Sequence, residues 1–185
     1  TTGTVEFNGR ELLGIPIRQM QDLWGPELAM VFQDPMTSLN PLVRVSRQVT
    51  EHLHRHLGVS RDQARQTALE LMREVRIPEP ETRLRAFPHE LSGGMRQRVC
   101  IAIALACEPT LLFADEPTTA LDVTVQHQIL NLLGREKQER DMTMVLVTHD
   151  LGVVAGRTDD TMVMYAGKVV EQAPTPTLFA EMRHP

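Results

Sequence analysis

The sequence predicts an α/β fold built on a largely parallel sheet, with an all-helical subdomain inserted into it. Short apolar runs of strand length alternate with helical patterns along most of the chain, which is the order that βαβ units require. The stretch at 42–90 has a helical pattern without strands. A wholly apolar run at 110–114, typical of a strand buried on both faces, ends directly in two acids. Such folds bind ligands at the carboxyl ends of their strands.

The first half of the chain holds two expected strands and one helical stretch. Residues 4–8 read as a strand that leads into an Asn-Gly turn. Residues 27–33 read as an apolar strand, and the loop that follows at 34–41 contains two prolines, which stop regular structure. A helical pattern runs from 43 to 76. The expected division is core strands at 1–41, a helical subdomain at 42–90 and the remaining core at 91–185.

Two serines mark helix starts. Ser60 is followed three positions later by Gln63, the pattern of a capping box. Ser92 precedes an apolar helix that extends through Ala106. The remaining elements expected are a helix at 123–140, a strand at 143–148, a further helix, and strands at 162–165 and 168–171 on either side of a turn at Gly167.

Composition limits the class of partner. The chain has 185 residues, the size of one domain, and 24 acidic against 19 basic residues give a net charge of −5. Neither this balance nor the single Trp and single Tyr suits a nucleic-acid surface. The longest apolar run, 99–107, is too short to span a bilayer, so a membrane role is expected to be peripheral. Both ends of the chain read as cuts through a larger protein.

Asp115 and Glu116 follow the apolar run at 110–114. In nucleotide hydrolases, the first acid of such a pair holds Mg²⁺ and the second polarises the attacking water. Taken alone, acids after a strand are more commonly helix caps or solvated side chains.

Three further patterns are weak one by one. Ser92-Gly93-Gly94 is an ordinary turn and cap, although free N–H groups at a helix start also make an anion site. His149 and Gln33 each follow an apolar strand. Such a histidine is more often a structural hydrogen-bonding residue, and such a glutamine is unremarkable by itself.

Together and in this order, these elements resemble the ATP-binding cassette (ABC) family. The matching motifs are its Q-loop, signature, Walker B, D-loop and H-switch, at Gln33, 91–97, 111–116, 120–122 and His149. The strings Val-Phe-Gln-Asp-Pro-Met-Thr-Ser-Leu-Asn-Pro at 31–41 and Ala-Asp-Glu-Pro-Thr-Thr-Ala-Leu-Asp at 114–122 are similar to the ATPase subunits of oligopeptide and dipeptide permeases. The resemblance covers essentially the whole chain and implies a P-loop NTPase-like fold.

The resemblance also implies a role for each matching residue. Asp115, with Gln33, would hold Mg²⁺, and Glu116 would be the general base for the attacking water. His149 would contact the γ-phosphate of ATP, and Gln33 would sense metal, water and transporter. The residues implied to reach nucleotide across a dimer interface, or to sit at that interface, are Ser92, Gly93, Gly94, Gln97 and Asp122.

The implied cofactors are ATP and Mg²⁺. The implied partners are a second cassette, identical or homologous, and integral-membrane permease subunits on which the Gln33 loop would dock. An extracytoplasmic solute-binding protein would take part indirectly, and nucleic acid would not. The expected location is the cytoplasmic face of the membrane.

One expected motif is absent from the sequence: no G-x-x-x-x-G-K-[ST] phosphate loop occurs in it. The Gly167-Lys168 pair has Met162 in place of the first glycine and Val169 in place of Ser/Thr. Because the phosphate-loop lysine and its backbone provide most phosphate binding, the isolated chain is expected to bind Mg-ATP poorly and to hydrolyse none.

Alternatives stay open at this point. The chain could be a non-enzymatic cassette that acts at most as a dimer partner, or an importer subunit for nickel or another small solute. Chromosomal ABC machines insert a long coiled coil between Q-loop and signature, which the short stretch at 43–90 does not suit, and ribosomal ones carry two cassettes per chain. His52, His54 and His56 have a spacing that can bind zinc, but no nearby acid or cysteine completes a site, and structural roles are favoured.

Overall fold

A computed structural model describes residues 3–119 and 121–181. The chain divides into two compact units, Thr1–Leu146 and Val147–Pro185. In chain order the first unit contains β1 (Glu6–Phe7), β2 (Arg10–Glu11), α1 (Ile17–Leu23), β3 (Leu28–Val31), α2 (Pro35–Ser38), α3 (Val45–His52), the π-helical turn η1 (Leu53–Leu57), α4 (Arg61–Glu74), α5 (Pro80–Arg83), the 3₁₀ turn η2 (Pro88–Glu90), α6 (Gly93–Leu105), β4 (Leu111–Asp115), α7 (Val123–Glu139) and most of β5 (Thr143–Val147). The elements that follow are α8 (Leu151–Val154), β6 (Asp160–Tyr165), β7 (Lys168–Pro174) and α9 (Thr175–Glu181).

The central sheet has the strand order β3-β4-β5. Strands β3 and β4 are parallel, and Val31 lies opposite Ala114 in their register. Parallel strands predicted from apolar runs are therefore confirmed, and the carboxyl ends of β3 and β4 meet at one edge. Burial differs from the expectation for β4: Leu112 and Ala114 are fully buried, whereas alternate residues such as Phe113 are partly exposed.

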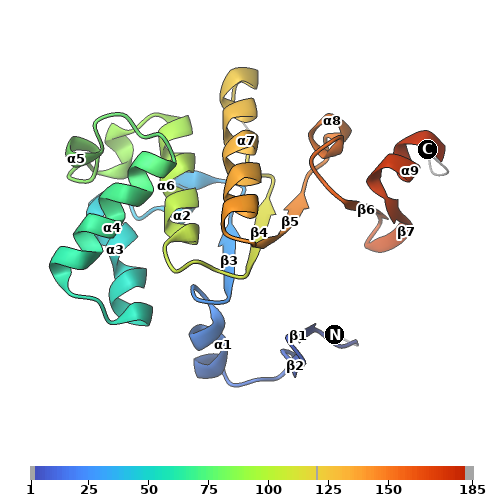
Figure 1. Ribbon diagram of the computed structural model, residues 1–185, viewed down its shortest axis with the longest axis horizontal. Helices are drawn as coiled ribbons and strands as arrows, with labels where there is room; N and C mark the ends of the chain where they lie inside the picture. Colours follow the sequence, from blue (N-terminus) through green and yellow to red (C-terminus); the bar gives the residue numbers. More distant parts are fainter. Residues whose placement is uncertain (1–2, 120, 182–185) are drawn as a thin grey trace. The chain divides into compact units, whose positions relative to one another are not determined.

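Helix α6 forms the centre of the first unit. It packs against α2, α3, α4 and β3, and Figure 1 shows it between α3 and α4 on one side and the sheet on the other. Eight of its thirteen residues are buried, so its apolar character has no single face. Ser92 caps the helix as predicted, since its side chain accepts a hydrogen bond from the N–H of Met95.

The region at 42–90, all of it described, is helical as expected and contains no strand. The capping box of Ser60 and Gln63 is present. The pattern expected at 43–76 is split into α3, η1 and α4, because Gly58 adopts a left-handed conformation with φ of 61° after η1. The expectation of irregular chain at 34–41 is wrong in part: α2 forms there, because Asp34 caps the N–H of Met36 and proline is tolerated in the first helical turn.

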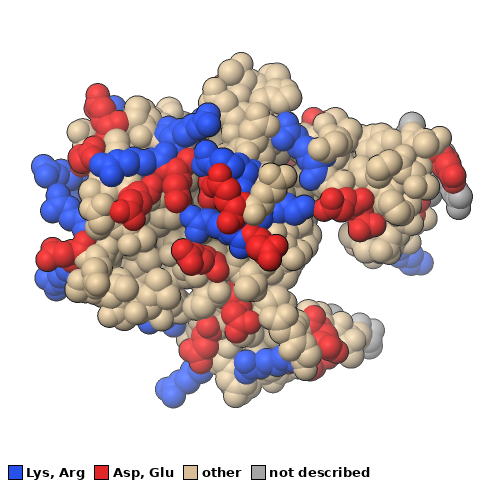
Figure 2. Space-filling model, in the orientation of Figure 1, with Lys and Arg blue, Asp and Glu red and all other residues tan. Residues whose placement is uncertain are grey.

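A cluster of charges joins the ends of α4 and α7. Glu136 is only 1% exposed and accepts hydrogen bonds from Arg135 at 2.6 Å and from Arg140 at 3.0 Å. Arg140 also donates to the Glu74 carboxylate at 2.8 Å, and Arg135 to the Glu74 carbonyl at 2.9 Å. The hydrogen bond to Glu136 raises the pKa of Arg135. Figure 2 shows acidic and basic side chains interspersed on the visible face.

The second unit contains an antiparallel hairpin of β6 and β7, with a register shift between Val163 and Met164. The hairpin matches the strand-turn-strand expected around Gly167. Helix α9, like α1 in the first unit, was not anticipated from the sequence. Among the described residues, no helix is both long enough and apolar enough to cross a bilayer.

Candidate functional site

The two predicted residues Gln33 and Glu116 are in direct contact. Nε2 of Gln33 donates a hydrogen bond of 2.6 Å to Oε2 of Glu116. The register of β3 and β4 explains this contact, because residues two positions beyond the Val31–Ala114 pair lie at the same edge of the sheet. The hydroxyl of Thr119 also donates to Oε2, at 2.7 Å. Two neutral donors therefore orient one carboxylate at the ligand-binding edge of a parallel sheet.

Glu116 has an unusual backbone conformation. Its φ of 43° lies in the left-handed region, which few residues other than glycine adopt. Residues held in such conformations cost about 1–3 kcal/mol and cluster at active sites. A carboxylate with a strained backbone and a fixed side chain is thus a candidate catalytic group.

Asp115 is the last residue of β4 and is partly exposed. The described residues contain no group of three or more His, Cys, Asp or Glu side chains able to enclose a metal ion. Mg²⁺ generally keeps several waters in proteins and binds through one or two carboxylates together with substrate phosphates. Asp115 and the neighbouring Gln33 amide can supply oxygen ligands of that kind.

A cavity of about 450 Å³ joins the start of α6 to the start of α7. Its lining includes the predicted residues Ser92, Gly93, Gly94 and Asp122, and it also includes Arg76 and Arg98. Asp122 caps α7 by accepting a hydrogen bond of 3.0 Å from the N–H of Val125. The structure thus places the signature glycines and Asp122 around one cavity, while Ala120 of the predicted D-loop lies outside the described residues.

Gly94 is required by close packing. A Cβ built on it would lie 2.9 Å from Cγ1 of Val125, closer than side chains approach one another. Gly93 has no atom within 4 Å of the equivalent position. The two adjacent glycines therefore have different roles: Gly94 lets α7 approach α6, and Gly93 leaves its backbone open toward the cavity.

Gln97 lies elsewhere than the other predicted ligand-binding residues. Its side chain is 1% exposed, and neither amide atom has a hydrogen-bond partner within the described part of the chain. It does not line the cavity between α6 and α7.

His149 belongs to the second unit and is exposed. It stands in a turn between β5 and α8. In this turn the N–H of Asp150 donates to the Thr148 hydroxyl at 3.1 Å, and the Asp150 carboxylate caps Gly152 at 2.8 Å. The turn holds the backbone on both sides of the histidine.

Two residues of the site were not anticipated from the sequence. Thr119 donates a hydrogen bond to Glu116. Because it follows Glu116 by three residues, its hydroxyl can reach the Glu116 side chain within one turn. Val125 contacts the Gly94 position from a different helix, and no local sequence signal marks such a contact.

The fold is that of an ATP-binding cassette. The model of the ABC transporter family matches residues 1–119, so this chain belongs to the ABC transporter family.

The curated relatives of this chain indicate a subgroup of the family. The chain is 55% identical to the probable peptide ABC transporter ATP-binding protein of Sinorhizobium fredii and 51% identical to the oligopeptide transport ATP-binding protein OppD of Bacillus subtilis. It is also 51% identical to the dipeptide transport ATP-binding protein DppD of Escherichia coli. These alignments cover 98–99% of this chain but 51–55% of the relatives. The chain therefore spans about half the length of the curated relatives that it matches.

Solved structures agree with this fold. The dimeric cassette MJ0796 in a post-hydrolysis state with bound ADP and Pi matches with a TM-score of 0.84 and 29% identity, over 95% of this chain and 74% of that one. The cbiO1 subunit from Clostridium perfringens, part of the cbiONQ transporter complex, matches with a TM-score of 0.82 and 28% identity, over 98% of this chain and 70% of that one.

Proposed function

We propose that this chain is part of the ATP-hydrolysing subunit of an importer for oligopeptides or dipeptides. The observation that carries the proposal is the carboxylate of Glu116, fixed by Gln33 at 2.6 Å at the carboxyl edge of parallel strands. The relatives named above support the substrate class, since they are peptide, oligopeptide and dipeptide transport proteins. They favour peptides over nickel.

Glu116 acts as the general base in this proposal. Bound Mg-ATP would supply the phosphoanhydride bond whose hydrolysis drives transport. Glu116 accepts a proton from the attacking water through the carboxylate that Gln33 and Thr119 orient. Asp115 would hold the metal ion together with Gln33, whose amide would also pass a change at the site to the helices that follow it in the chain. His149 would contact the γ-phosphate of ATP.

A second cassette completes the site. Ser92, Gly93 and Gly94 offer backbone N–H groups at the start of α6, where the helix dipole favours an anion. They would contact nucleotide held by the partner cassette, and Asp122 would lie at that interface. The dimeric state of MJ0796 supports this arrangement. Membrane permease subunits and, through them, an extracytoplasmic binding protein complete the transporter at the cytoplasmic face of the membrane.

Residues 1–185 alone do not turn over ATP in this proposal. The reason is the missing G-x-x-x-x-G-K-[ST] motif in the sequence, because its lysine and backbone provide most phosphate binding. ATP hydrolysis above background by the purified 185-residue chain would refute this part of the proposal while leaving the family assignment in place.

The test of the general base uses the whole natural protein that contains this chain. Replacing Glu116 with Gln keeps the size of the side chain and removes its basicity, so we expect ATP binding to persist and hydrolysis to fall about 10²- to 10⁴-fold. Glu6→Gln, an exposed acid in β1, is the matched control and should keep full turnover. Wild-type turnover by the Glu116→Gln protein would overturn the assignment.

The substrate class is tested separately, by uptake into cells that lack the natural protein and receive it on a plasmid. We expect uptake of a labelled tripeptide to be restored by the wild type and not by Glu116→Gln. Restoration of Ni²⁺ uptake without peptide uptake would contradict the peptide assignment.

A further inference from the structure

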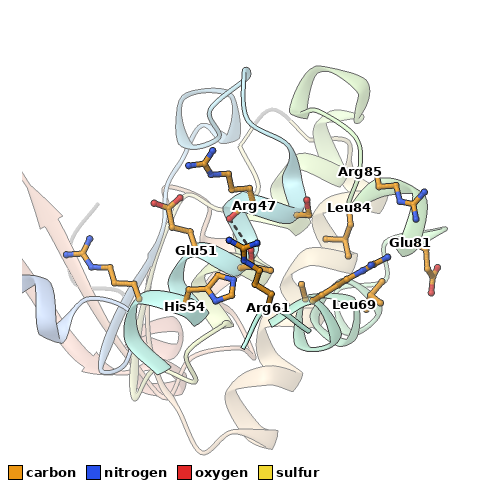
Figure 3. A pocket seen from close by; sticks show the side chains of 13 residues that line it. Arg47, Glu51, His54, Arg61, Leu69, Glu81, Leu84 and Arg85 are labelled. Atoms are coloured by element: carbon orange, nitrogen blue, oxygen red, sulfur yellow. Dashed lines mark hydrogen bonds between the residues drawn. The ribbon is translucent and has the colours of Figure 1, made fainter. Parts of the chain in front are cut away.

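A cavity in the helical region of the first unit shares no residue with the candidate site. Its volume is about 910 Å³, within the range of small-molecule sites. Residues from α3, η1, α4 and the segment around α5 line it. In Figure 3, Arg47, Arg61 and His54 lie around one end, Arg85 and Glu81 lie at the other, and Leu69 and Leu84 lie between them.

The charge of this cavity is opposite to that of the chain. Five arginines and two glutamates line it, whereas the whole chain has a net charge of −5. One of the two acids, Glu81, is already paired with Arg73 at 2.5 Å. The cavity therefore presents an excess of positive charge that its own acids do not neutralise.

Most of these arginines have no partner among the described residues. Within the described part of the chain, no hydrogen bond or ion pair is formed by the side chains of Arg47, Arg61, Arg65 or Arg85. The fifth, Arg55, donates to the neutral amide of Gln21 at 3.3 Å. Four guanidinium groups are thus available to a ligand.

Helix stability does not account for the placement of these arginines. Arg61 is the first residue of α4, whose first turn also contains Asp62, and Arg47 is the third residue of α3, whose first turn contains no acid. Positive charge at the start of a helix opposes the helix dipole. Arg61 and Arg65 are also four residues apart on one helix, a spacing at which like charges destabilise it. An anion bound in the cavity would reduce both the unfavourable interaction with the helix dipole and the repulsion between Arg61 and Arg65.

We propose that this cavity binds a phosphorylated small molecule with an apolar body, at a site separate from that for ATP hydrolysis. Guanidinium groups bind phosphate through paired hydrogen bonds, which is why arginine is favoured at phosphate sites. Ala68, Leu69 and Leu84 supply an apolar surface for the body of the ligand. This inference does not depend on the proposed ATPase reaction.

The test is a fluorescence titration of the whole natural protein with 1-naphthyl phosphate, in saturating Mg-ADP so that the nucleotide site is filled. We expect saturable binding at least tenfold tighter than that of inorganic phosphate. The variant R47A/R61A should lose at least tenfold in affinity and keep its affinity for ADP. The control R10A/R18A removes the same charge from β2 and α1 and should bind as the wild type does. Arg65→Gln is a second variant of the cavity, in case the double variant does not fold.

Three results would overturn the proposal. They are an absence of saturable binding to the wild type, equal affinity in the wild type and R47A/R61A, and equal loss of affinity in R10A/R18A. A hexaglutamate peptide is titrated in parallel. Binding of that peptide through Arg47 and Arg61, without binding of naphthyl phosphate, would also overturn the small-molecule assignment and identify the cavity as a surface for an acidic protein segment.

Discussion

Gln33 and Glu116 are 83 positions apart in the sequence, yet their side chains are joined by a hydrogen bond of 2.6 Å. The contact links the loop after β3 to the carboxylate after β4. Because α2 and the helical region follow Gln33 directly in the chain, a movement of that region that carries Gln33 away must also release Glu116. The hydrogen bond is therefore a connection between the helical region and the candidate general base.

Removal of this hydrogen bond should slow hydrolysis in the natural protein. A hydrogen bond to a charged group is worth about 1.5 kcal/mol, so Gln33→Ala should lower ATP turnover about tenfold. Gln33→Glu should lower it further, since two carboxylates would then face each other. Steady-state turnover at saturating ATP measures both. Full activity in Gln33→Ala would show that the contact has no part in catalysis.

A methyl group at Gly94 should destabilise the first unit. The added Cβ meets Val125 at 2.9 Å, and valine in a helix has one strongly preferred rotamer, so it cannot readily turn away. Overpacking of this kind costs about 1–3 kcal/mol. The measurement is urea unfolding of Gly94→Ala beside Gly93→Ala, which has open space and should unfold at the wild-type midpoint or above it. Recovery in Gly94→Ala/Val125→Ala would identify the clash as the cause.

Neutralising the buried carboxylate of Glu136 should also destabilise the protein. Glu136→Gln leaves Arg135 and Arg140 facing each other without their shared acid, although both remain partly exposed, at 34% and 16%. We expect a loss of about 2 kcal/mol, below the cost of breaking a fully buried pair. Glu139, which is 62% exposed and 3.7 Å from Arg135, is the control, and Glu139→Gln should cost less than about 1 kcal/mol. Equal losses in the two variants would contradict this account.

Stability should fall on mild acidification because of two stacked histidines. The rings of His52 and His56 lie 6.1 Å apart. Burial, followed by repulsion from His56, lowers the pKa of His52 below 6.5, and burial, followed by the charge of Arg55, lowers the pKa of His56. The unfolded chain then binds more protons than the folded one, so the unfolding free energy declines as pH falls below 6.5.

Urea unfolding above and below pH 6.5 measures this effect. In His52→Gln/His56→Gln the decline should be smaller than in the wild type. His127→Gln, an exposed position on α7, should retain the wild-type decline. The same pH dependence in the double variant as in the wild type would exclude these two rings as its source.

Local patterns in the sequence were sufficient to predict much of this structure. The apolar runs that became β3, β4 and β5 and the capping residues Ser60 and Ser92 were found because strands and caps depend on a few neighbouring residues. Helix α1 was not anticipated, since its seven residues follow Pro16 and have no side-chain cap. The turn α2 was mistaken for a loop because proline is compatible with both.

The candidate site was predictable as a set of motifs but not as a geometry. Gln33 and Glu116 were predicted from two separate motifs, and only the register of two strands brings them together. The left-handed backbone of Glu116 and the close approach of Val125 to Gly94 depend on contacts between distant segments. The cavity lined by Arg47, Arg61 and Arg85 arises in the same way, from segments that are separate in the sequence.

Helix α7 is anchored at both ends. Asp122 and Val125 at its start border the cavity at the signature glycines, and Arg135 and Arg140 at its end hold Glu74 of α4. Its 17 residues make a rod of about 25 Å. A rigid helix that is held at both ends passes a displacement of one end on to the other. A ligand that displaces Asp122 would therefore also displace Glu74, the last residue of α4, through helix α7.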